Sequence, residues 1–280
     1  MYYCILNKKE FLQSKSTGST FKAISKSILE ELEIELPNID IQERIVQVLD
    51  KSKDIIKQRK EQIEVMDKLR ESIFNYMFGR NKIFENVKLG EFTNHVSSGA
   101  TPKGGQKVYI TQGIPFIRSQ NVMMNKIVYD DISYIPIEIH ESMNRSKVLK
   151  NDVLLNITGA SIGRVAVYEG EDNMANVNQH VCIIRLKDDL KPVYVCNYIA
   201  TNEFQNKIKN MNSGATREAL NYDQIKNFII PKPPIELQNE FAEIVNKIEK
   251  EKELLKQSLE QLETNFKALE QKAFNGELFN

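Results

Sequence analysis

Two long stretches of the chain place mainly apolar residues at alternating steps of four and three, with Glu and Lys between them. The first runs from about Asp40 to Phe78, and the second lies near the end of the chain. This spacing is a heptad seam and predicts two coiled-coil helices, each on the order of 55 to 60 Å long. Gly79 and Gly276 follow the stretches, where glycine commonly ends a helix. The seam positions are Ile41, Ile45, Val48, Ile55, Ile63, Met66, Leu69 and Ile73 in the first stretch, and Phe241, Val245, Ile248, Lys252, Leu255, Leu259, Leu262, Phe266, Leu269 and Ala273 in the second.

An internal repeat relates the two stretches. At a fixed offset of 196 residues the chain matches itself without a gap over about 75 residues, which predicts that one structural unit occurs twice. The residues before each long helix belong to the repeat as well. The matching pairs include Tyr2 with Tyr198, Gly18 with Gly214, Ile34 with Ile230, Pro37 with Pro233, Gln42 with Gln238, Lys51 with Lys247, and Phe78 with Phe274.

The segment between the long helices has a different residue pattern, in which short β-rich runs alternate with turn-forming residues. It ends in two predicted helices, Val193–Lys209 and Asn221–Asn227, followed by a strand at Phe228–Ile230. Earlier strands are predicted at Val108–Ile110, Pro115–Arg118, Val153–Ile157, Gly163–Tyr168 and His180–Leu186. The fold class is therefore α+β: one globular α+β domain plus two long coiled-coil helices. The predicted parts are residues 1–35, the tail of a preceding domain; 36–82, the first long helix; 83–232, the complete domain; and 233–280, the second long helix.

The composition is that of a globular protein, with 280 residues, 41% hydrophobic and 27% charged. No apolar run approaches the 20 or so residues of a membrane span, and the first residues do not resemble a secretory signal. Three cysteines, Cys4, Cys182 and Cys196, without a CxxC motif argue against disulfides and a zinc site. These features predict a cytoplasmic protein with no membrane partner and no metal site.

The balance of acidic and basic residues limits how tightly this chain alone can bind nucleic acid. Lys and Arg number 38, as do Asp and Glu, so the net charge is zero. Residues 83–232 carry only slightly more basic than acidic residues. Since phosphate contacts dominate non-specific affinity for DNA, the chain alone should bind DNA modestly and in a salt-sensitive way.

Enzymatic motifs are incomplete in this sequence. No GxxxxGK[ST] loop occurs, and Ile230–Ile235 lacks the polar residue and the aromatic residue that flank the proline pair of amino-methyltransferases. The Asp188–Lys191 run has no positioned partner for nuclease chemistry, and Gly159–Gly163 is out of register with a G-x-S-x-G elbow. We therefore predict no catalytic residues and no cofactor for this chain. An enzyme acting alone stays an alternative, which purified chain that cuts or methylates DNA without partners would support.

Polar residues that suit DNA recognition gather on five predicted turns of the middle segment. Arg can pair with guanine, Asn and Gln with adenine, and hydroxyl groups with phosphate. The same residue types also form turns and cap helices, which is the structural alternative for each of them. The candidate DNA-binding residues are Ser97, Ser98, Thr101 and Lys103; Arg118, Ser119, Gln120 and Asn121; Thr158, Ser161 and Arg164; Asn178 and Gln179; and Ser213, Thr216 and Arg217.

The ordered combination of motifs resembles the specificity (S) subunit of type I restriction-modification systems. The motifs are Leu89-Gly-Glu-Phe92, Ser98-Gly-Ala-Thr-Pro102, Gly159-Ala-Ser-Ile-Gly-Arg-Val165, Ser213-Gly-Ala-Thr-Arg217 and Leu269-Glu-Gln-Lys-Ala-Phe-Asn-Gly-Glu-Leu-Phe279. The resemblance implies that residues 83–232 form a target recognition domain that binds one half of a bipartite site in double-stranded DNA. It also implies that the two long helices pack as an antiparallel coiled coil that acts as a spacer. These helices would dock modification (M) subunits, which carry the methyltransferase chemistry and bind S-adenosylmethionine. Restriction (R) subunits join such complexes, whose role is phage defence.

The sequence departs from this family in one respect. Full-length S subunits carry two recognition domains, whereas this chain has one complete domain and the tail of another. It is either a fragment of a longer subunit or a half-length form that pairs with a second copy, and a homodimer would read a palindromic site. A strand at Leu32–Leu36 could complete the domain of another chain. A coiled-coil scaffold that does not bind DNA is the alternative function.

Overall fold

The computed structural model describes residues 2–16, 23–34, 36–79, 82–212 and 219–279. Helices and strands are mixed, and two helices of 40 residues each are present, which confirms the α+β class. The chain forms two compact units: a tail unit of residues 1–69 and 248–280, and a domain unit of residues 70–247. Among the described residues, no helix combines the length and apolar character that crossing a bilayer requires.

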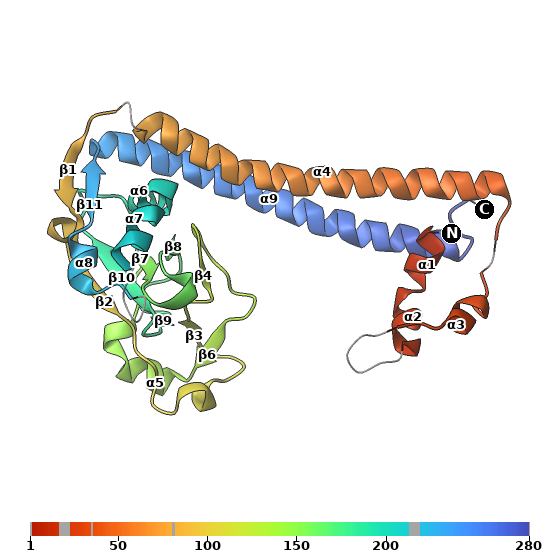
Figure 1. The fold of residues 1–280 in the computed structure, drawn as a ribbon, viewed down its shortest axis with the longest axis horizontal. Helices are drawn as coiled ribbons and strands as arrows, with labels where there is room; N and C mark the ends of the chain where they lie inside the picture. The colour runs from red at the N-terminus through yellow and green to blue at the C-terminus, as the bar shows by residue number, and fades with distance from the viewer. Residues whose placement is uncertain (1, 17–22, 35, 80–81, 213–218, 280) are drawn as a thin grey trace. The chain divides into compact units, whose positions relative to one another are not determined.

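The long helices α4 (Ile39–Phe78) and α9 (Ile235–Phe274) run antiparallel (Figure 1). In the tail unit, Lys60 Nζ lies 2.7 Å from Glu263 Oε1, and Lys252 pairs with Asp67. Residue numbers that increase along α4, from 60 to 67, thus face residue numbers that decrease along α9, from 263 to 252. Lys252 occupies a seam position and is 7% exposed. Its ammonium group is buried there, and the Asp67 carboxylate provides the opposite charge. The predicted antiparallel coiled coil is confirmed.

Secondary structure follows the 196-residue repeat. The helix α3 (Lys26–Glu30) corresponds to α8 (Tyr222–Lys226), and α4 corresponds to α9, each with the same first and last positions at that offset. The described residues of the run Leu32–Leu36, for which a strand paired with another chain is expected, do not lie in a strand within this chain. Its counterpart in the domain unit, β11 (Ile229–Lys232), is held by antiparallel pairing with β1 (Glu85–Lys88). A strand requires such a partner for its backbone groups.

The domain unit is built on small sheets. A four-stranded antiparallel sheet has the order β2-β10-β7-β8, and a three-stranded sheet has the order β6-β3-β9, in which β3 and β9 are parallel. Two-stranded pairs join β1 with β11 and β4 with β5. The strands not yet placed are β2 (Thr93–Ser98), β3 (Ile114–Ile117), β4 (Val122–Met123), β5 (Lys126–Ile127), β6 (Ser133–Ile135), β7 (Val153–Asn156), β8 (Val165–Val167), β9 (Asn176–Val177) and β10 (Val181–Leu186).

Helices flank these sheets and differ in part from the sequence prediction. The predicted helix Val193–Lys209 is two helices, α6 (Pro192–Ala200) and α7 (Asn202–Asn212), because Thr201 between them is extended. The Thr201 hydroxyl accepts a hydrogen bond from Phe204 N, which caps the second helix. The predicted strand Val108–Ile110 is also wrong, since Val108 ends the short helix η2. The other helices of the unit are α5 (Ile137–Ser142), η1 (Leu89–Phe92), η2 (Gly105–Val108), η3 (Asn144–Ser146) and η4 (Gly159–Ser161).

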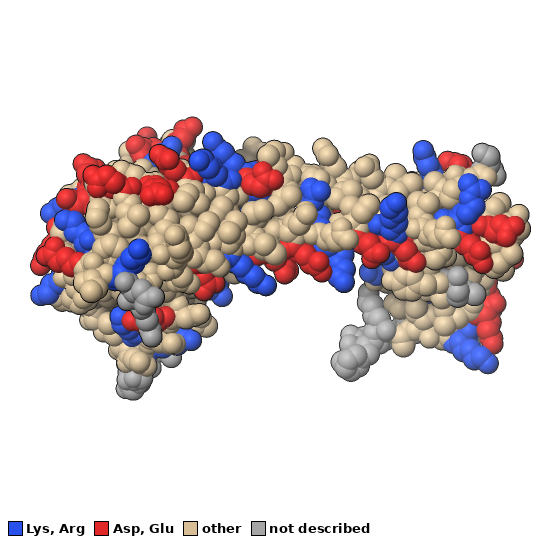
Figure 2. Space-filling view, turned by 90° about the horizontal axis from the view of Figure 1, so that it is seen from above, with Lys and Arg blue, Asp and Glu red and all other residues tan. Residues whose placement is uncertain are grey.

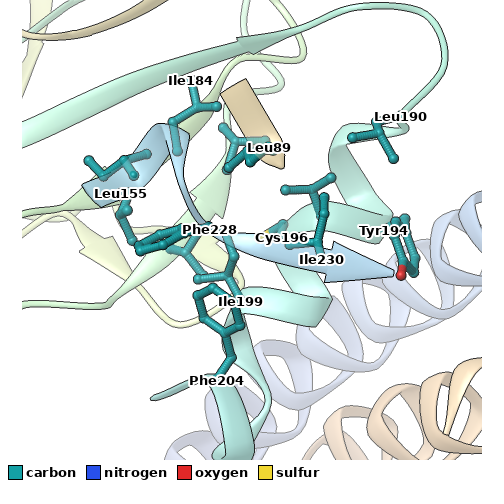
Figure 3. Packing of buried hydrophobic residues seen from close by; sticks show 14 of the residues in the cluster. Leu89, Leu155, Ile184, Leu190, Tyr194, Cys196, Ile199, Phe204, Phe228 and Ile230 are labelled. Carbon is teal, nitrogen blue, oxygen red and sulfur yellow. The ribbon is translucent and has the colours of Figure 1, made fainter. Parts of the chain in front are cut away.

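Both faces of the four-stranded sheet are buried. Leu155 and Ile184 face one cluster, whereas Leu154 and Ile183 face another, as the two-residue period of a strand requires. The first cluster also takes in residues of α6, α7, α8 and β11, several of which are labelled in Figure 3. Aromatic rings extend this cluster to the long helices: Tyr194 packs at 4.8 Å from Phe78, and Phe241 packs at 5.4 Å from the same ring.

The tail unit has its own small core. Tyr3 of α1 (Tyr2–Asn7) packs with Ile45, Leu49 and Ala273, and its hydroxyl donates to Asp50. The Lys53 ammonium lies 4.5 and 4.3 Å from the ring centroids of Tyr2 and Tyr3, a cation–π arrangement. These contacts fix α1 on α4. The helix α2 (Lys9–Lys15) follows and buries Leu12.

Candidate nucleic-acid interface

The first predicted turn leaves the end of β2 and lies against the turn before β10. Gly99 N donates to Val181 O at 3.1 Å, and Ala100 N donates to Val177 O at 3.3 Å. A Cβ atom at Gly99 would lie 1.8 Å from the Val177 carbonyl oxygen, so only glycine allows this approach. Ser98 Oγ is 2.6 Å from the Tyr222 hydroxyl, a partner that the sequence analysis did not select.

Four side chains from three predicted turns form one hydrogen-bonded row, which we call the polar row. The Thr101 hydroxyl donates to Gln179 Oε1. Gln179 Nε2 donates to His180 Nε2 at 2.9 Å, and His180 Nδ1 donates to Thr158 Oγ1 at 2.6 Å. Thr101 and Gln179 are exposed, and Thr158 and His180 are half-buried.

The polar row contains hydrogen-bond donors that are not used within it. One amide hydrogen of Gln179 and the hydroxyl hydrogen of Thr158 are not used within the row. The sequence analysis selected Thr101, Thr158 and Gln179 but missed His180, which joins them. Its place directly after Asn178-Gln179, at the start of a strand, was the only local signal.

Buried asparagines hold two of the predicted turns in place. Asn178 is 8% exposed, and its Oδ1 accepts from His180 N at 3.1 Å, so it shapes the turn that carries Gln179. Asn156 is fully buried and donates to Ser119 O at 2.7 Å, which ties the second turn to β7. Asn156 was not selected from the sequence.

Three of the four selected side chains of the second turn, those of Arg118, Gln120 and Asn121, have partners within the chain. Asn121 is 2% exposed; its Oδ1 accepts from Arg118 N, and its Nδ2 donates to Val128 O at 3.1 Å. Arg118 and Gln120 both contact Asp131, with Gln120 Nε2 donating to Asp131 Oδ2 at 2.6 Å. These contacts stabilise the turn, whatever else its side chains bind.

Four other selected residues are described and lie outside the polar row. Ser97 is buried on β2 with its hydroxyl 2.6 Å from His95 Nε2, and Lys103 is exposed on the loop after Thr101. Ser161 ends η4, and Arg164 contacts the Met123 sulfur at 3.2 Å. Ser213, Thr216 and Arg217 lie outside the described residues. Next to them in sequence, Leu220 N donates to Ile157 O at 2.9 Å, beside Thr158 of the row.

Neither positive nor negative charge dominates the surface of the long helices, in line with the net charge of zero. Acidic and basic side chains are interspersed along the long helices on the face in Figure 2. Among the described residues, no group of three or more His, Cys, Asp or Glu side chains is placed to hold a metal ion. Burial raises the pKa of the Cys182 and Cys196 thiols to about 12, so both are protonated at neutral pH.

Stability should depend on pH through His95. Its burial, and then the nearby Arg185 guanidinium, lower the pKa of His95 below the ordinary value. Because the folded state holds this proton less tightly than the unfolded state, His95 contributes stability above about pH 6.5 that is lost as the pH falls. Chemical denaturation from neutral to mildly acidic pH should show stability falling, and the fall should be shallower in His95→Gln. An equal slope in both proteins would contradict this assignment.

Comparisons with known proteins bear on what this surface does. The family model described as "Type I restriction modification DNA specificity domain" matches residues 1–65 and 81–264. The chain is 22% identical to the type I restriction enzyme MjaVIII specificity subunit of Methanocaldococcus jannaschii, covering 94% of this chain and 66% of that protein. It is 30% identical to the EcoBI specificity subunit of Escherichia coli, over 60% of this chain and 36% of that protein. The chain thus spans about two thirds of the length of the first relative and about a third of the second.

Solved structures share the fold. The type I restriction-modification S subunit from M. genitalium superimposes with a TM-score of 0.60 at 17% identity, covering 98% of this chain and 71% of that chain. The HsdS subunit from Thermoanaerobacter tengcongensis gives a TM-score of 0.50 at 18% identity, covering 99% and 68%. At these identities the likeness is one of fold.

Proposed function

Because the chain belongs to the family of type I restriction-modification DNA specificity domains, we propose that it is a sequence-specific DNA-recognition subunit of a type I restriction-modification complex. Residues 83–232 read one half of a bipartite site in double-stranded DNA. The chain itself performs no catalysis. Methyl transfer takes place on the M subunits, which bind S-adenosylmethionine, and R subunits join the same cytoplasmic complex.

The polar row is the observation that carries the proposed DNA contact. It presents an amide and hydroxyl groups from three loops on one exposed surface. A Gln amide is suited to the N6 and N7 edge of adenine in the major groove, and threonine hydroxyls are suited to phosphate or base edges. Exposed Lys103 on the neighbouring loop supplies a cation for the DNA backbone.

The long helices support the proposed docking of M subunits. Apart from the seam, α4 and α9 expose apolar side chains that the coiled coil does not cover, including Val65 at 53% and Leu254 at 59% exposure. Docking of an M subunit would remove such side chains from water, which is favourable. A second copy of the chain would supply the other half-site reader and make the target palindromic.

Substituting Gln179 by alanine should weaken recognition of the target sequence. In the complex with M subunits, loss of one amide contact to a base should cost about 1–3 kcal/mol of discrimination, on the order of 5- to 150-fold in the ratio of cognate to non-cognate methylation. The rate of methyl transfer from labelled S-adenosylmethionine to both DNAs measures this ratio. Gln120→Ala is the matched control, because Gln120 is also an exposed glutamine on a predicted turn but is held by Asp131.

Two results would count against the proposal. If Gln179→Ala and Gln120→Ala have the same small effect, the polar row does not read bases. If the complex with M subunits shows no salt-dependent binding to any DNA, the chain is a scaffold. Lys103→Ala distinguishes phosphate contacts from base contacts. Loss of a phosphate contact should weaken binding to all DNA sequences equally and reduce the slope of log K against log salt concentration by about one.

A further inference from the structure

Backbone pairing holds one end of the polar row in place. Thr158 and His180 lie just past the end of the ladder between β7 and β10, where Ile157 N donates to His180 O at 3.0 Å. The Asn178 side chain accepts from His180 N at 3.1 Å, which fixes the backbone of the histidine a second time. The two side chains therefore meet at positions that the sheet determines.

The other end of the polar row is held in the same way. Ala100 N donates to Val177 O at 3.3 Å, and this bond keeps the turn of Thr101 beside the turn of Gln179. With both ends fixed, the freedom that remains lies in the hydrogen atoms. The two hydroxyl groups can rotate, either ring nitrogen of a neutral histidine can carry the proton, and the amide can turn over so that its oxygen and nitrogen change places.

Two arrangements of these hydrogens satisfy every bond of the polar row. In the first, Thr101 donates to Gln179 Oε1. Gln179 Nε2 then donates to His180 Nε2, and His180 Nδ1 donates to Thr158. In the second, every bond is reversed: Thr158 donates to Nδ1, the proton on Nε2 is donated to the amide oxygen, and the amide nitrogen donates to Thr101. The two arrangements differ in the ring nitrogen that carries the proton and in the orientation of the Gln179 amide.

The orientation of the amide decides what a base meets. Gln179 is exposed, and the polar row uses one lone pair of its Oε1 and one hydrogen of its Nε2, which leaves one of each. An adenine needs this combination, since its N6 group donates and its N7 accepts. In the first arrangement the acceptor lies toward Thr101 and the donor toward His180. In the second they are exchanged, so a base in the same position meets donor against donor and acceptor against acceptor.

We propose that His180 is a positioning residue that determines which base Gln179 reads, given the proposed DNA contact of the polar row, on which this role rests. Nδ1 of His180 carries the ring proton and donates it to Thr158, which leaves Nε2 as an acceptor. An acceptor at Nε2 holds the amide nitrogen of Gln179 toward the ring and the amide oxygen toward Thr101. The amide thus presents a single order of acceptor and donor, and Thr158 influences base recognition from the far side of the ring.

The ring proton of His180 is measured in the free chain by nitrogen NMR. The sequence contains three histidines, so isotopic labelling of histidine gives few ring signals, and those of His180 are the ones missing from His180→Gln. At about pH 8, where an ordinary imidazole is neutral, Nδ1 should give the signal of a protonated ring nitrogen and Nε2 that of an unprotonated one. A protonated Nε2 would overturn the proposal.

Thr158→Val tests the bond that fixes the ring proton. Valine keeps the shape of threonine without its hydroxyl, so the His180 signals should move toward those of a mixture of both tautomers. Ser97→Ala is the matched control, because the Ser97 hydroxyl lies 2.6 Å from the ring of a different histidine, His95. It should leave the His180 signals unchanged. Signals that respond to neither substitution would count against the proposed role of Thr158.

Two substitutions of His180 test its effect on base recognition in the complex with M subunits. Lysine only donates, so His180→Lys should turn the amide oxygen of Gln179 toward position 180. The ratio of cognate to non-cognate methylation should then fall about 5- to 150-fold, as for Gln179→Ala, although Gln179 is still present. His180→Gln offers an amide oxygen in place of Nε2, and it should retain a larger ratio than His180→Lys.

Thr158→Val in the same complex covers the case in which His180→Lys does not fold, as judged by circular dichroism. An amide released to both orientations spends about half its time in the one that reads the base, so the affinity for the cognate site should fall about twofold. Ser97→Ala should not change it. A ring that serves only to pack would instead change methylation of cognate and non-cognate DNA alike and leave their ratio unchanged.

The results distinguish this role of His180 from the proposed DNA contact. If Gln179→Ala lowers the ratio and His180→Lys does not, or if His180→Lys and His180→Gln lower it equally, the role of His180 is wrong and the DNA contact stands. If neither Gln179→Ala nor His180→Lys changes the ratio, the DNA contact is wrong and the role of His180 with it. The ring signals are recorded without DNA or M subunits, so the direction of the hydrogen bonds is decided separately.

Discussion

Phe241→Ala should lower the free energy of unfolding of the domain unit by about 3–5 kcal/mol, the usual cost of removing a buried phenylalanine ring. Phe241 is fully buried, and its ring meets those of Phe74 and Phe78 edge-on at 5.4 Å each. The substitution removes these contacts and leaves a cavity where α9 meets the end of α4. Urea denaturation followed by circular dichroism measures the change.

Tyr76→Ala is the matched control for Phe241→Ala. Tyr76 lies on the same long helix as Phe74 and Phe78 but is 84% exposed, so the loss of its ring should change the free energy of unfolding by less than about 0.5 kcal/mol. If Phe241→Ala costs no more than Tyr76→Ala, the aromatic cluster does not stabilise this junction.

Arg185→Ala should destabilise the domain unit by a similar amount, about 3–5 kcal/mol. Arg185 donates two hydrogen bonds of 2.8 Å to the carboxylate of Asp152, whose side chain is 1% exposed. This pairing raises the pKa of the guanidinium above its ordinary value. Without Arg185, the Asp152 carboxylate is left buried and without its cation, although it still accepts from Leu149 N at 2.7 Å.

The reverse substitution should cost less. In Asp152→Ala the unpaired group is Arg185, whose side chain is 30% exposed and can turn toward water. The double variant should be more stable than the sum of the two single effects predicts, because each single variant removes the same pair. Equal losses in both single variants together with additive effects in the double variant would contradict this account of the pair.

The candidate DNA-contacting residues are the part of the sequence prediction that the structure changes most. Thr101, Thr158 and Gln179 were selected because their residue types suit DNA, and the fold joins them through His180. Asn121 was selected for the same reason, yet it is buried and holds its own turn. The same side-chain chemistry serves turns and ligands, so residue type cannot separate the two. Whether any of these side chains touches DNA stays a prediction.

The periodic features of this protein were determined by its sequence alone. The heptad seams and the 196-residue repeat predicted the two long helices, because burial of a stripe every three and four residues depends only on local spacing. The ordered motifs likewise identified the family, which the comparisons confirm. Contacts between distant positions were decided by the tertiary structure. Gln179 meets Thr101 across 78 residues, and β11 is a strand because β1 pairs with it, whereas the described residues of its repeat counterpart are not in a strand within this chain. Hydrogen bonds and strand pairing need a partner brought from elsewhere in the chain, and no local pattern records whether that partner arrives.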